Sequence, residues 1–498
     1  MTRLRTRELP VFPVTHGPVR PEVSPDAAPA EHRPEPMGPE GGPTVGLVTL
    51  GCDKNTVDSE RMMAVLASGG ARVVPEPEEA DVVVVNTCGF IDVAKEESVE
   101  AILDACRLKA DGKVQAVAAV GCLVQRYADE LAEEIPEVDL FLGLADMGRL
   151  VPELRERELL PPPEALPTME RPLRMLSTQT SHTSFLKISE GCDHSCAFCA
   201  IPHMRGLHRS APVEELVREA QELEAAGVQE LNIVSQDSTW YGKDLRREAV
   251  RSAGPGRDPE PTPMLPDLLK SLLEGTTLPW YRLFYMYPSG ITPELVELMG
   301  SSDRLLPYLD MPIQHGSDRV LKAMRRPERR TTIRERVGWL REAVPDLTLR
   351  TTVIVGFPGE TDEDFRELLD LLEEVRFDRV GAFPFSVEEG TPAAEMEDHL
   401  PEEVKRQRVE ALMDLQREIS FESNLDQVGR RRHVLVDETV QDDPEVVARG
   451  RTAGQAADVD GVTNILRRQD HGEPPAPGDM LDVEIVDAVE YDLVARID

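Results

Sequence analysis

Short apolar runs rich in valine alternate with helix-length amphipathic stretches in two separate series along this 498-residue chain. The first series lies between residue 44 and about residue 150 and contains the runs VGLVTL, VVVVNT and VQAVAAV. Continuous β-branched runs of this kind are typical of parallel strands that are buried on both faces of a sheet. The pattern therefore predicts a doubly wound α/β domain.

The second series, from about residue 184 to residue 386, contains six strand candidates that are mostly separated by helical stretches. Six βα units are too few to close an eight-stranded barrel, so a partial, open (βα)6 barrel is expected. The six candidates are SFLKIS, QELNIVS, YRLFYMY, LLPYLDMPI, LTLRTTVIVG and RVGAFPFS.

The segments outside the two series have a different composition. Residues 1–43 contain ten prolines and almost no apolar periodicity, which predicts a disordered leader. Proline-rich stretches within residues 151–183 and 246–264 indicate an interdomain linker and a surface insertion. The last ~75 residues contain short strands with turn signals, which predict a small antiparallel β-barrel. The expected domains are a leader (1–43), an N-terminal domain (44–160), a core (178–410) and a terminal barrel (424–498).

Composition limits where the protein acts. The formal net charge is −37, and no apolar run approaches the ~20 residues that a membrane-spanning helix needs. The first residues have no apolar stretch typical of a secretory signal. Seven cysteines without an export signal favour metal or redox chemistry over a disulfide framework. We therefore expect a cytoplasmic protein with no membrane partner.

Three cysteines lie close together in the stretch EGCDHSCAFCAIPHMRG, just after the first strand of the second series. Cys192, Cys196 and Cys199 form a C-x3-C-x2-C pattern, called here the compact triad. A closed tetrahedral metal site needs four ligands. The pattern therefore supplies one ligand too few for such a site.

A second group, called here the spread triad, consists of Cys52, Cys88 and Cys122. Each of the three follows a predicted strand of the first series. The carboxyl ends of parallel strands gather at one edge of a doubly wound sheet, where ligands bind. The three cysteines are therefore expected to meet. Cys106 lies instead on the apolar stripe of a predicted helix and is interpreted as a core side chain.

Two kinds of metal site fit these triads. Zinc would need a fourth ligand, for which His194 and His203 are candidates beside the compact triad. Cysteine thiolates also hold 4Fe–4S clusters with one cysteine on each iron, so that three cysteines leave one iron open to another molecule. Neither triad has the paired knuckles typical of zinc sites, and the cluster interpretation is favoured for both.

The compact triad at the end of the first strand of a six-fold βα series resembles the radical S-adenosylmethionine superfamily. The resemblance implies that the open iron binds S-adenosylmethionine and that its reductive cleavage yields a 5′-deoxyadenosyl radical. Phe198 matches the aromatic position that this superfamily places against the adenine. Ile354 and Gly356, in the stretch VIVGFPGE, match its fifth-strand segment that shapes the adenosine site.

Together with the other two domains, the chain resembles the methylthiotransferases of that superfamily. The stretch GRTAGQAADVDGV near the C-terminus is similar to their TRAM domain. The resemblance implies two 4Fe–4S clusters, with the spread triad holding the one that carries sulfur for transfer. It also implies two molecules of S-adenosylmethionine, an electron donor and a sulfur source.

These methylthiotransferases modify either tRNA adenosines or an aspartate of ribosomal protein S-twelve in the small subunit. Residues 424–498 contain 8 basic and 17 acidic residues, a net charge of −9 that would repel tRNA phosphates. The stretch SQDSTWYG also resembles the ribosomal-protein branch, which implies methylthiolation at the β-carbon of the aspartate. Asp237, Trp240 and Tyr241 in this stretch fit either substrate contact or loop packing. A tRNA-modifying enzyme and a non-enzymatic iron–sulfur carrier remain the alternatives.

Overall fold

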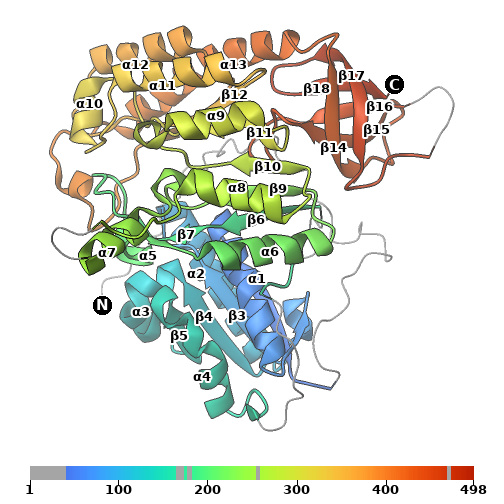
Figure 1. Ribbon diagram of the computed structural model, residues 1–498. Helices are drawn as coiled ribbons and strands as arrows, with labels where there is room; N and C mark the ends of the chain where they lie inside the picture. Colours follow the sequence, from blue (N-terminus) through green and yellow to red (C-terminus); the bar gives the residue numbers. More distant parts are fainter. Residues whose placement is uncertain (1–40, 164–172, 177–181, 254–257, 468–472, 498) are drawn as a thin grey trace. The chain divides into compact units, whose positions relative to one another are not determined.

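The computed structural model describes residues 41–163, 173–176, 182–253, 258–467 and 473–497 (Figure 1). Its described residues divide into two units, one ending at Ser423 and one beginning at Asn424. Almost all of the predicted leader lies outside the described residues, as does much of the predicted linker. No helix in the described ranges has both the length and the apolar character needed to cross a membrane.

The first unit begins with a five-stranded parallel sheet, shown in blue and teal in Figure 1. The strand order is β2-β1-β3-β4-β5, which confirms the doubly wound prediction. The sequence pattern missed the two outermost strands because each has only three or four residues. The strands are β1 (Thr44–Thr49), β2 (Arg72–Val74), β3 (Val82–Thr87), β4 (Ala116–Gly121) and β5 (Leu140–Gly143).

Helices cover both faces of this sheet. Helices α1 (Asp53–Ser68) and α4 (Leu150–Glu156) pack on one face, and α2 (Asp92–Ala110) and α3 (Cys122–Glu134) pack on the other. The valines of β3 alternate between the two cores, which is why its run is continuously apolar. Cys106 lies in the core beneath α2, as expected. Because α4 belongs to this domain, the linker begins later than residue 151.

A six-stranded parallel sheet follows in the same unit, in the order β13-β12-β11-β10-β9-β6. All six strand candidates of the second series are present, and the two end strands are not paired with each other in the described sheet. The open (βα)6 architecture is therefore confirmed. Its strands are β6 (Thr183–Lys187), β9 (Glu230–Val234), β10 (Trp280–Leu283), β11 (Leu305–Asp310), β12 (Thr348–Val355) and β13 (Arg379–Pro384).

Six helices pack their apolar sides on one face of this sheet and form the largest core of the protein. They are α6 (Val213–Ala225), α8 (Leu265–Gly275), α9 (Pro293–Ser301), α11 (Arg330–Ala343), α12 (Asp362–Val375) and α13 (Glu402–Leu425). Shorter elements lie in the connections: β7 (Ser189–Glu190), β8 (Arg209–Ser210), α5 (Ile201–Arg205), α7 (Lys243–Ala253) and α10 (Asp318–Ala323). Helix α7 occupies part of the segment in which a loop-like insertion was expected.

The second unit is a closed five-stranded barrel in the order β14-β15-β16-β18-β17. Closure pairs every strand on both sides and buries a core of small and branched apolar residues. Four of the strand pairs are antiparallel, as predicted, whereas β16 and β18 run parallel. The strands are β14 (Arg431–Thr439), β15 (Val446–Thr452), β16 (Thr463–Leu466), β17 (Met480–Ala488) and β18 (Leu493–Ile497).

Candidate functional site

The spread triad lies at one edge of the N-terminal sheet, because its cysteines follow three adjacent strands: β1, β3 and β4. The loops after β1 and β3 approach so closely that a Cβ atom on Gly51 would lie 2.7 Å from the Cβ of Cys88. Gly51 also has a φ of +90°, which glycine adopts without strain. Cys52 is exposed at this edge, whereas Cys88 and Cys122 are buried.

Asn55 connects the three loops that carry the spread triad. Its side-chain Nδ2 donates hydrogen bonds to the carbonyls of Leu50 (2.8 Å) and Thr87 (3.1 Å). Its Oδ1 accepts from the Sγ of Cys122 at 3.8 Å. Sequence reasoning missed this residue, although an asparagine three positions after a strand-end cysteine could have pointed to it.

The compact triad lies on the connection between β7 and α5, beyond the carboxyl end of β6. Its loop returns on itself, with the amide of Cys192 donating to the carbonyl of Gly206 at 3.0 Å. Gly191 allows this return, since a Cβ at that position would lie 2.3 Å from the carbonyl oxygen of Leu207. The local sequence is therefore sufficient to bring these three cysteines together.

A buried arginine contacts the compact triad from the other side of the core. Nη1 of Arg326 donates to the Sγ of Cys196 at 3.8 Å, and Nη2 donates to the carbonyl of Pro312 at 3.1 Å. The guanidinium also lies 3.8 Å from the ring centre of Tyr287 and is paired with Glu328. Sequence reasoning missed Arg326, which is 130 positions away from Cys196.

The buried cysteines hold their protons tightly when no metal is bound. Burial raises the pKa of Cys192, Cys199 and Cys122 to about 12, although backbone hydrogen bonds to the first two and the charge of Arg205 beside the third oppose the rise. In each case a neighbouring cysteine of the same triad contributes to the rise. Metal binding must therefore displace these protons.

A site for a single metal ion needs several donor side chains close together. In the ranges that the structure describes, no three His, Cys, Asp or Glu side chains converge closely enough to hold one metal ion. The sulfurs that hold a 4Fe–4S cluster bind different irons and therefore stay further apart than the ligands of one ion. The three cysteines of each triad supply thiolates of the kind that hold a 4Fe–4S cluster with one iron left open.

The two histidines considered as zinc ligands have other positions. The Nε2 of His194 lies 2.7 Å from Oδ2 of Asp237, and its ring stacks on Tyr287 at 4.5 Å. His203 is exposed on helix α5. Asp237 is itself buried and also accepts two hydrogen bonds from Thr239. Nothing in these contacts favours a histidine as a fourth ligand.

The two aromatic residues near Asp237, Trp240 and Tyr241, differ in how deeply they are buried. Tyr241 is fully buried in the core, and its hydroxyl donates to the carbonyl of Ala211 at 2.7 Å. Trp240 is half-buried, with its ring 4.7 Å from that of His194 and Lys243 above it. Tyr241 is therefore a packing residue, and Trp240 remains open to a ligand.

Two of the three residues expected around the adenosine, Phe198 and Ile354, belong to one apolar cluster. Phe198 and Ile354 are half-buried in one apolar cluster with Phe357 and Phe385. Gly356 follows β12, the fifth strand of the open barrel, and its amide donates to Glu360 at 2.7 Å. The cluster offers a flat aromatic ring and apolar surface beside the compact triad, which suits a nucleoside.

A buried ionic network joins the two triads across the domain boundary. Arg205, six residues after Cys199, donates to Asp58 (3.1 Å), to Glu190 (2.9 Å) and to Asn55 (2.6 Å). Lys187 contacts the same two carboxylates. Burial would raise the pKa of Glu190, but these two cations outweigh it and hold the pKa at about 2. The network fixes helix α1 of the spread triad against the loop of the compact triad.

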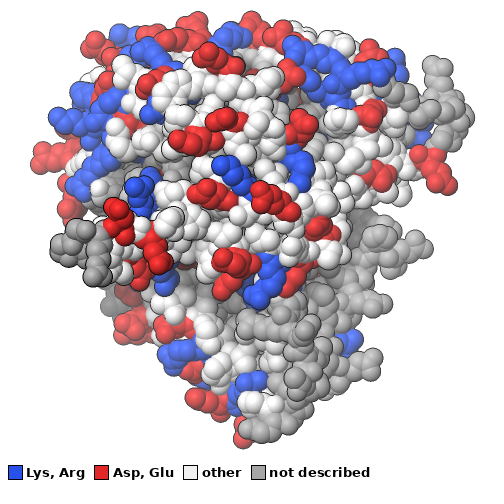
Figure 2. All heavy atoms as spheres, viewed as in Figure 1, with Lys and Arg blue, Asp and Glu red and all other residues white. Residues whose placement is uncertain are grey.

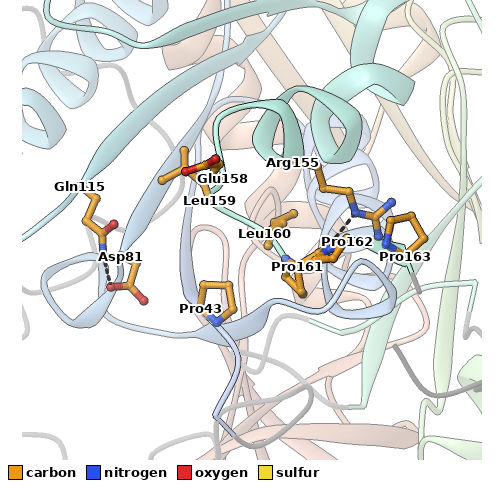
Figure 3. A pocket seen from close by; sticks show the side chains of 10 residues that line it. All are labelled: Pro43, Asp81, Gln115, Arg155, Glu158, Leu159, Leu160, Pro161, Pro162 and Pro163. Carbon is orange, nitrogen blue, oxygen red and sulfur yellow. Dashed lines mark hydrogen bonds between the residues drawn. The ribbon is translucent and has the colours of Figure 1, made fainter. Parts of the chain in front are cut away.

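A hollow of about 600 Å³ in the N-terminal domain lies elsewhere (Figure 3). It is bordered by Pro43, Asp81 and Gln115, which precede β1, β3 and β4. It therefore lies at the amino ends of the strands, opposite the edge that carries the cysteines. Gln115 donates a hydrogen bond to Asp81 (2.7 Å) at its border.

Three family models match consecutive parts of the chain. They are the uncharacterized protein family UPF0004 over residues 44–143, the radical SAM superfamily over residues 186–372 and the TRAM domain over residues 428–497. The fold and the second of these matches indicate an enzyme with a radical SAM core.

Curated relatives narrow this class. The chain is 45% identical over 91% of its length to the ribosomal protein uS12 methylthiotransferase RimO of Anaeromyxobacter sp. (strain K), of which the match covers 93%. The RimO protein of Geobacter sulfurreducens is 42% identical over 91% of this chain and 98% of its own. The chain therefore belongs to the RimO family of radical SAM methylthiotransferases, which use S-adenosylmethionine and 4Fe–4S clusters.

Among solved structures, the radical S-adenosylmethionine methyltransferase TsrM from Kitasatospora setae matches 68% of this chain and 72% of its own. The TM-score is 0.48 and the sequence identity is 16%.

Proposed function

We propose that this enzyme adds a methylthio group to the β-carbon of an aspartate in ribosomal protein uS12. The observation that carries the proposal is the presence of two cysteine triads in one unit, joined by the buried network around Arg205. The relatives named as uS12 methylthiotransferases support the choice of substrate.

Each triad has a separate role in this proposal. Cys192, Cys196 and Cys199 hold the cluster that binds S-adenosylmethionine, with Phe198, Ile354 and Gly356 around the adenosine. Cys52, Cys88 and Cys122 hold the auxiliary cluster. The corresponding domains are residues 44–160 for the auxiliary cluster, 178–410 for the radical core and 424–498 for the TRAM barrel, after a leader over residues 1–43.

When bound, these groups supply a 5′-deoxyadenosyl radical, a methyl group and sulfur at an otherwise unreactive C–H bond. The protein residues provide position and charge. Arg326 donates to a sulfur of the compact triad, and Asn55 holds the three loops of the spread triad together. Arg205 and Lys187 keep the two triads in one fixed arrangement, so that capture of the substrate becomes an intramolecular step.

Partners follow from the same proposal. A basic ribosomal protein complements the acidic terminal barrel, and the reaction needs an electron donor and a sulfur source in the cytoplasm. Figure 2 shows acidic and basic side chains interspersed over the visible face, so net charge alone does not mark a docking patch. The relatives reported above are named as enzymes that modify uS12, which favours this substrate over tRNA.

The test compares the mass of uS12 from cells with and without this gene. The expected difference is one methylthio group on one aspartate, located by fragmentation. Unmodified uS12 in both strains, together with a modified tRNA nucleoside that depends on the gene, would contradict the proposal.

A further inference from the structure

Lys54 occupies an unusual position beside the spread triad. It lies two residues after Cys52, the exposed cysteine of that triad, yet its own side chain is buried. Its Nζ lies 3.1 Å from the ring centre of Tyr285, which belongs to the radical core. Lys54 therefore stands where the edge of the N-terminal sheet meets the mouth of the open barrel.

The ring beneath Lys54 is held by three strands of the core. Tyr285 follows β10 and has a φ of +58°, which costs free energy for a residue other than glycine. Its amide donates to Asp310 (3.1 Å) at the end of β11, and Arg350 of β12 donates to the same carboxylate (2.8 Å). A conformation of this kind, fixed by several partners, is typical of functional sites.

The cations close to the spread triad differ in how fully they are paired. Arg205 and Lys187 each contact two carboxylates, that of the buried Asp58 and that of the half-buried Glu190. Lys54 contacts one carboxylate within the described ranges, that of Asp53, at 3.2 Å. The Tyr285 hydroxyl donates to the same Asp53 oxygen at 3.1 Å. Since an ammonium has three N–H donors, Lys54 retains capacity for a further acceptor.

An aspartate substrate brings a negative charge into this confined space. Burying a carboxylate without a partner is costly, and the thiolates of two clusters would repel it. The site therefore needs a cation close to Cys52 that is not already committed to two carboxylates. Lys54 meets this requirement. Its cation–π contact with the ring of Tyr285 fixes the position of its ammonium group.

We propose that the Lys54 ammonium binds the carboxylate of the substrate aspartate and so places its β-carbon beside the spread triad. This inference rests on the proposed function and adds the residue that selects an acidic side chain. The selectivity is electrostatic: a neutral amide of the same shape would bind less tightly at this position.

The test measures how well the holoenzyme distinguishes uS12 from uS12 in which the target aspartate is replaced by asparagine. Dissociation constants for both proteins are measured with wild-type enzyme, Lys54→Met, Lys54→Gln and Lys54→Arg. Wild-type enzyme should prefer the aspartate form by about tenfold or more, since a lost buried charge pair usually costs at least that much. Lys54→Met and Lys54→Gln should bind both forms equally, and Lys54→Arg should keep part of the preference.

Lys95→Met is the matched control. Lys95 also bridges the N-terminal domain and the core, through Glu388 at 2.8 Å, but from helix α2. This variant should keep the full preference for aspartate. Iron content and thermal unfolding are measured for every variant, and Lys54→Gln serves where Lys54→Met does not fold.

The outcomes separate the inference from the proposed function. If wild-type enzyme methylthiolates uS12 but Lys54→Met or Lys54→Gln retains the preference for aspartate, the inference is wrong and the proposed function stands. Loss of the preference in Lys95→Met as well would also overturn the inference, because the effect would then not be specific to Lys54. If wild-type enzyme does not modify uS12, the proposed function fails and the inference fails with it.

Discussion

The two cysteine triads each contain three thiols, but their cysteines are arranged differently along the chain. The compact triad occupies eight consecutive positions on one loop, whereas the spread triad comes from three loops separated by more than 30 positions each. The first needs only a local turn. The second exists only if three strands are paired in the right order and their loops are held together by Asn55. The comparison shows that the spread triad depends on the tertiary fold, and the compact triad depends on it much less.

Replacing one cysteine in each triad should give the largest difference. We expect Cys196→Ala to abolish formation of 5′-deoxyadenosine, because its triad is the one proposed to hold the cluster that binds S-adenosylmethionine. Cys88→Ala should still form 5′-deoxyadenosine but transfer no methylthio group. Both products are measured by mass spectrometry after anaerobic reconstitution. A Cys88→Ala enzyme that forms no 5′-deoxyadenosine while its compact-triad cluster is intact would show that the roles are assigned wrongly.

Iron content should show separately whether each triad holds a cluster. The wild-type enzyme is expected to bind about eight irons, the number in two 4Fe–4S clusters. Gly51→Ala should lose about half, because its Cβ would lie 2.7 Å from the Cβ of Cys88. Gly191→Ala should lose the other half, because its Cβ would lie 2.3 Å from the carbonyl oxygen of Leu207. Iron and sulfide analysis tests both variants, and stoichiometric zinc in the wild-type protein would contradict the cluster assignment.

The buried Arg326 donates a side-chain hydrogen bond to a sulfur of the compact triad. Removing the N–H donor in Arg326→Met should lower the reduction potential of the compact-triad cluster, because a hydrogen bond to sulfur stabilises the reduced, more negative form. The expected shift is about 50 mV, since about 1.4 kcal/mol corresponds to 59 mV for a one-electron couple. A titration followed by electron paramagnetic resonance measures it. Arg329→Met, whose guanidinium donates only to backbone carbonyls in the described contacts, should leave the potential unchanged.

The smallest effect is expected in the terminal barrel. Glu484 and Glu490 are exposed there, and their replacement by lysine should weaken binding of uS12 several-fold at low salt. The effect should fade as salt rises, since exposed charges are screened. Asp460, although acidic, is unsuitable for this test because it is buried and accepts from the amide of Ala456 at 2.9 Å. The measurement is the affinity of the wild-type and variant enzymes for uS12 across a salt series. An unchanged affinity in the variant would exclude docking through these carboxylates.

Most of the architecture could be predicted from the pattern of residues. The continuous valine runs and the six spaced strand candidates were enough to indicate a doubly wound domain and an open barrel, because burial on two faces leaves a plain apolar signature. Strands β2 and β5 were missed because three or four residues carry too little periodicity. The parallel pairing of β16 and β18 was missed because a strand's pattern does not show the direction of its neighbour.

The candidate site divides in a similar way. The cysteines were predicted from their spacing and their place after strands, and the structure places those of the spread triad after three adjacent strands, β1, β3 and β4. The partners of those cysteines were not identified. Asn55, Arg205 and Arg326 are ordinary polar residues in the sequence, and their importance comes from contacts with residues up to 150 positions away.

By itself, the sequence determined the kinds of chemistry present: two sets of three thiols, an aromatic position beside one set and apolar runs that must form parallel sheets. Only the tertiary structure decided which charges would be buried together and which would keep room for a ligand. Arg205 and Lys187 are held between the same two carboxylates, whereas Lys54 rests on Tyr285 with one carboxylate beside it. The physical reason is that the burial of an apolar strand or helix can be predicted from the pattern of residues within that segment. The pairing of buried charges depends instead on distances between segments, which are set only when the chain folds.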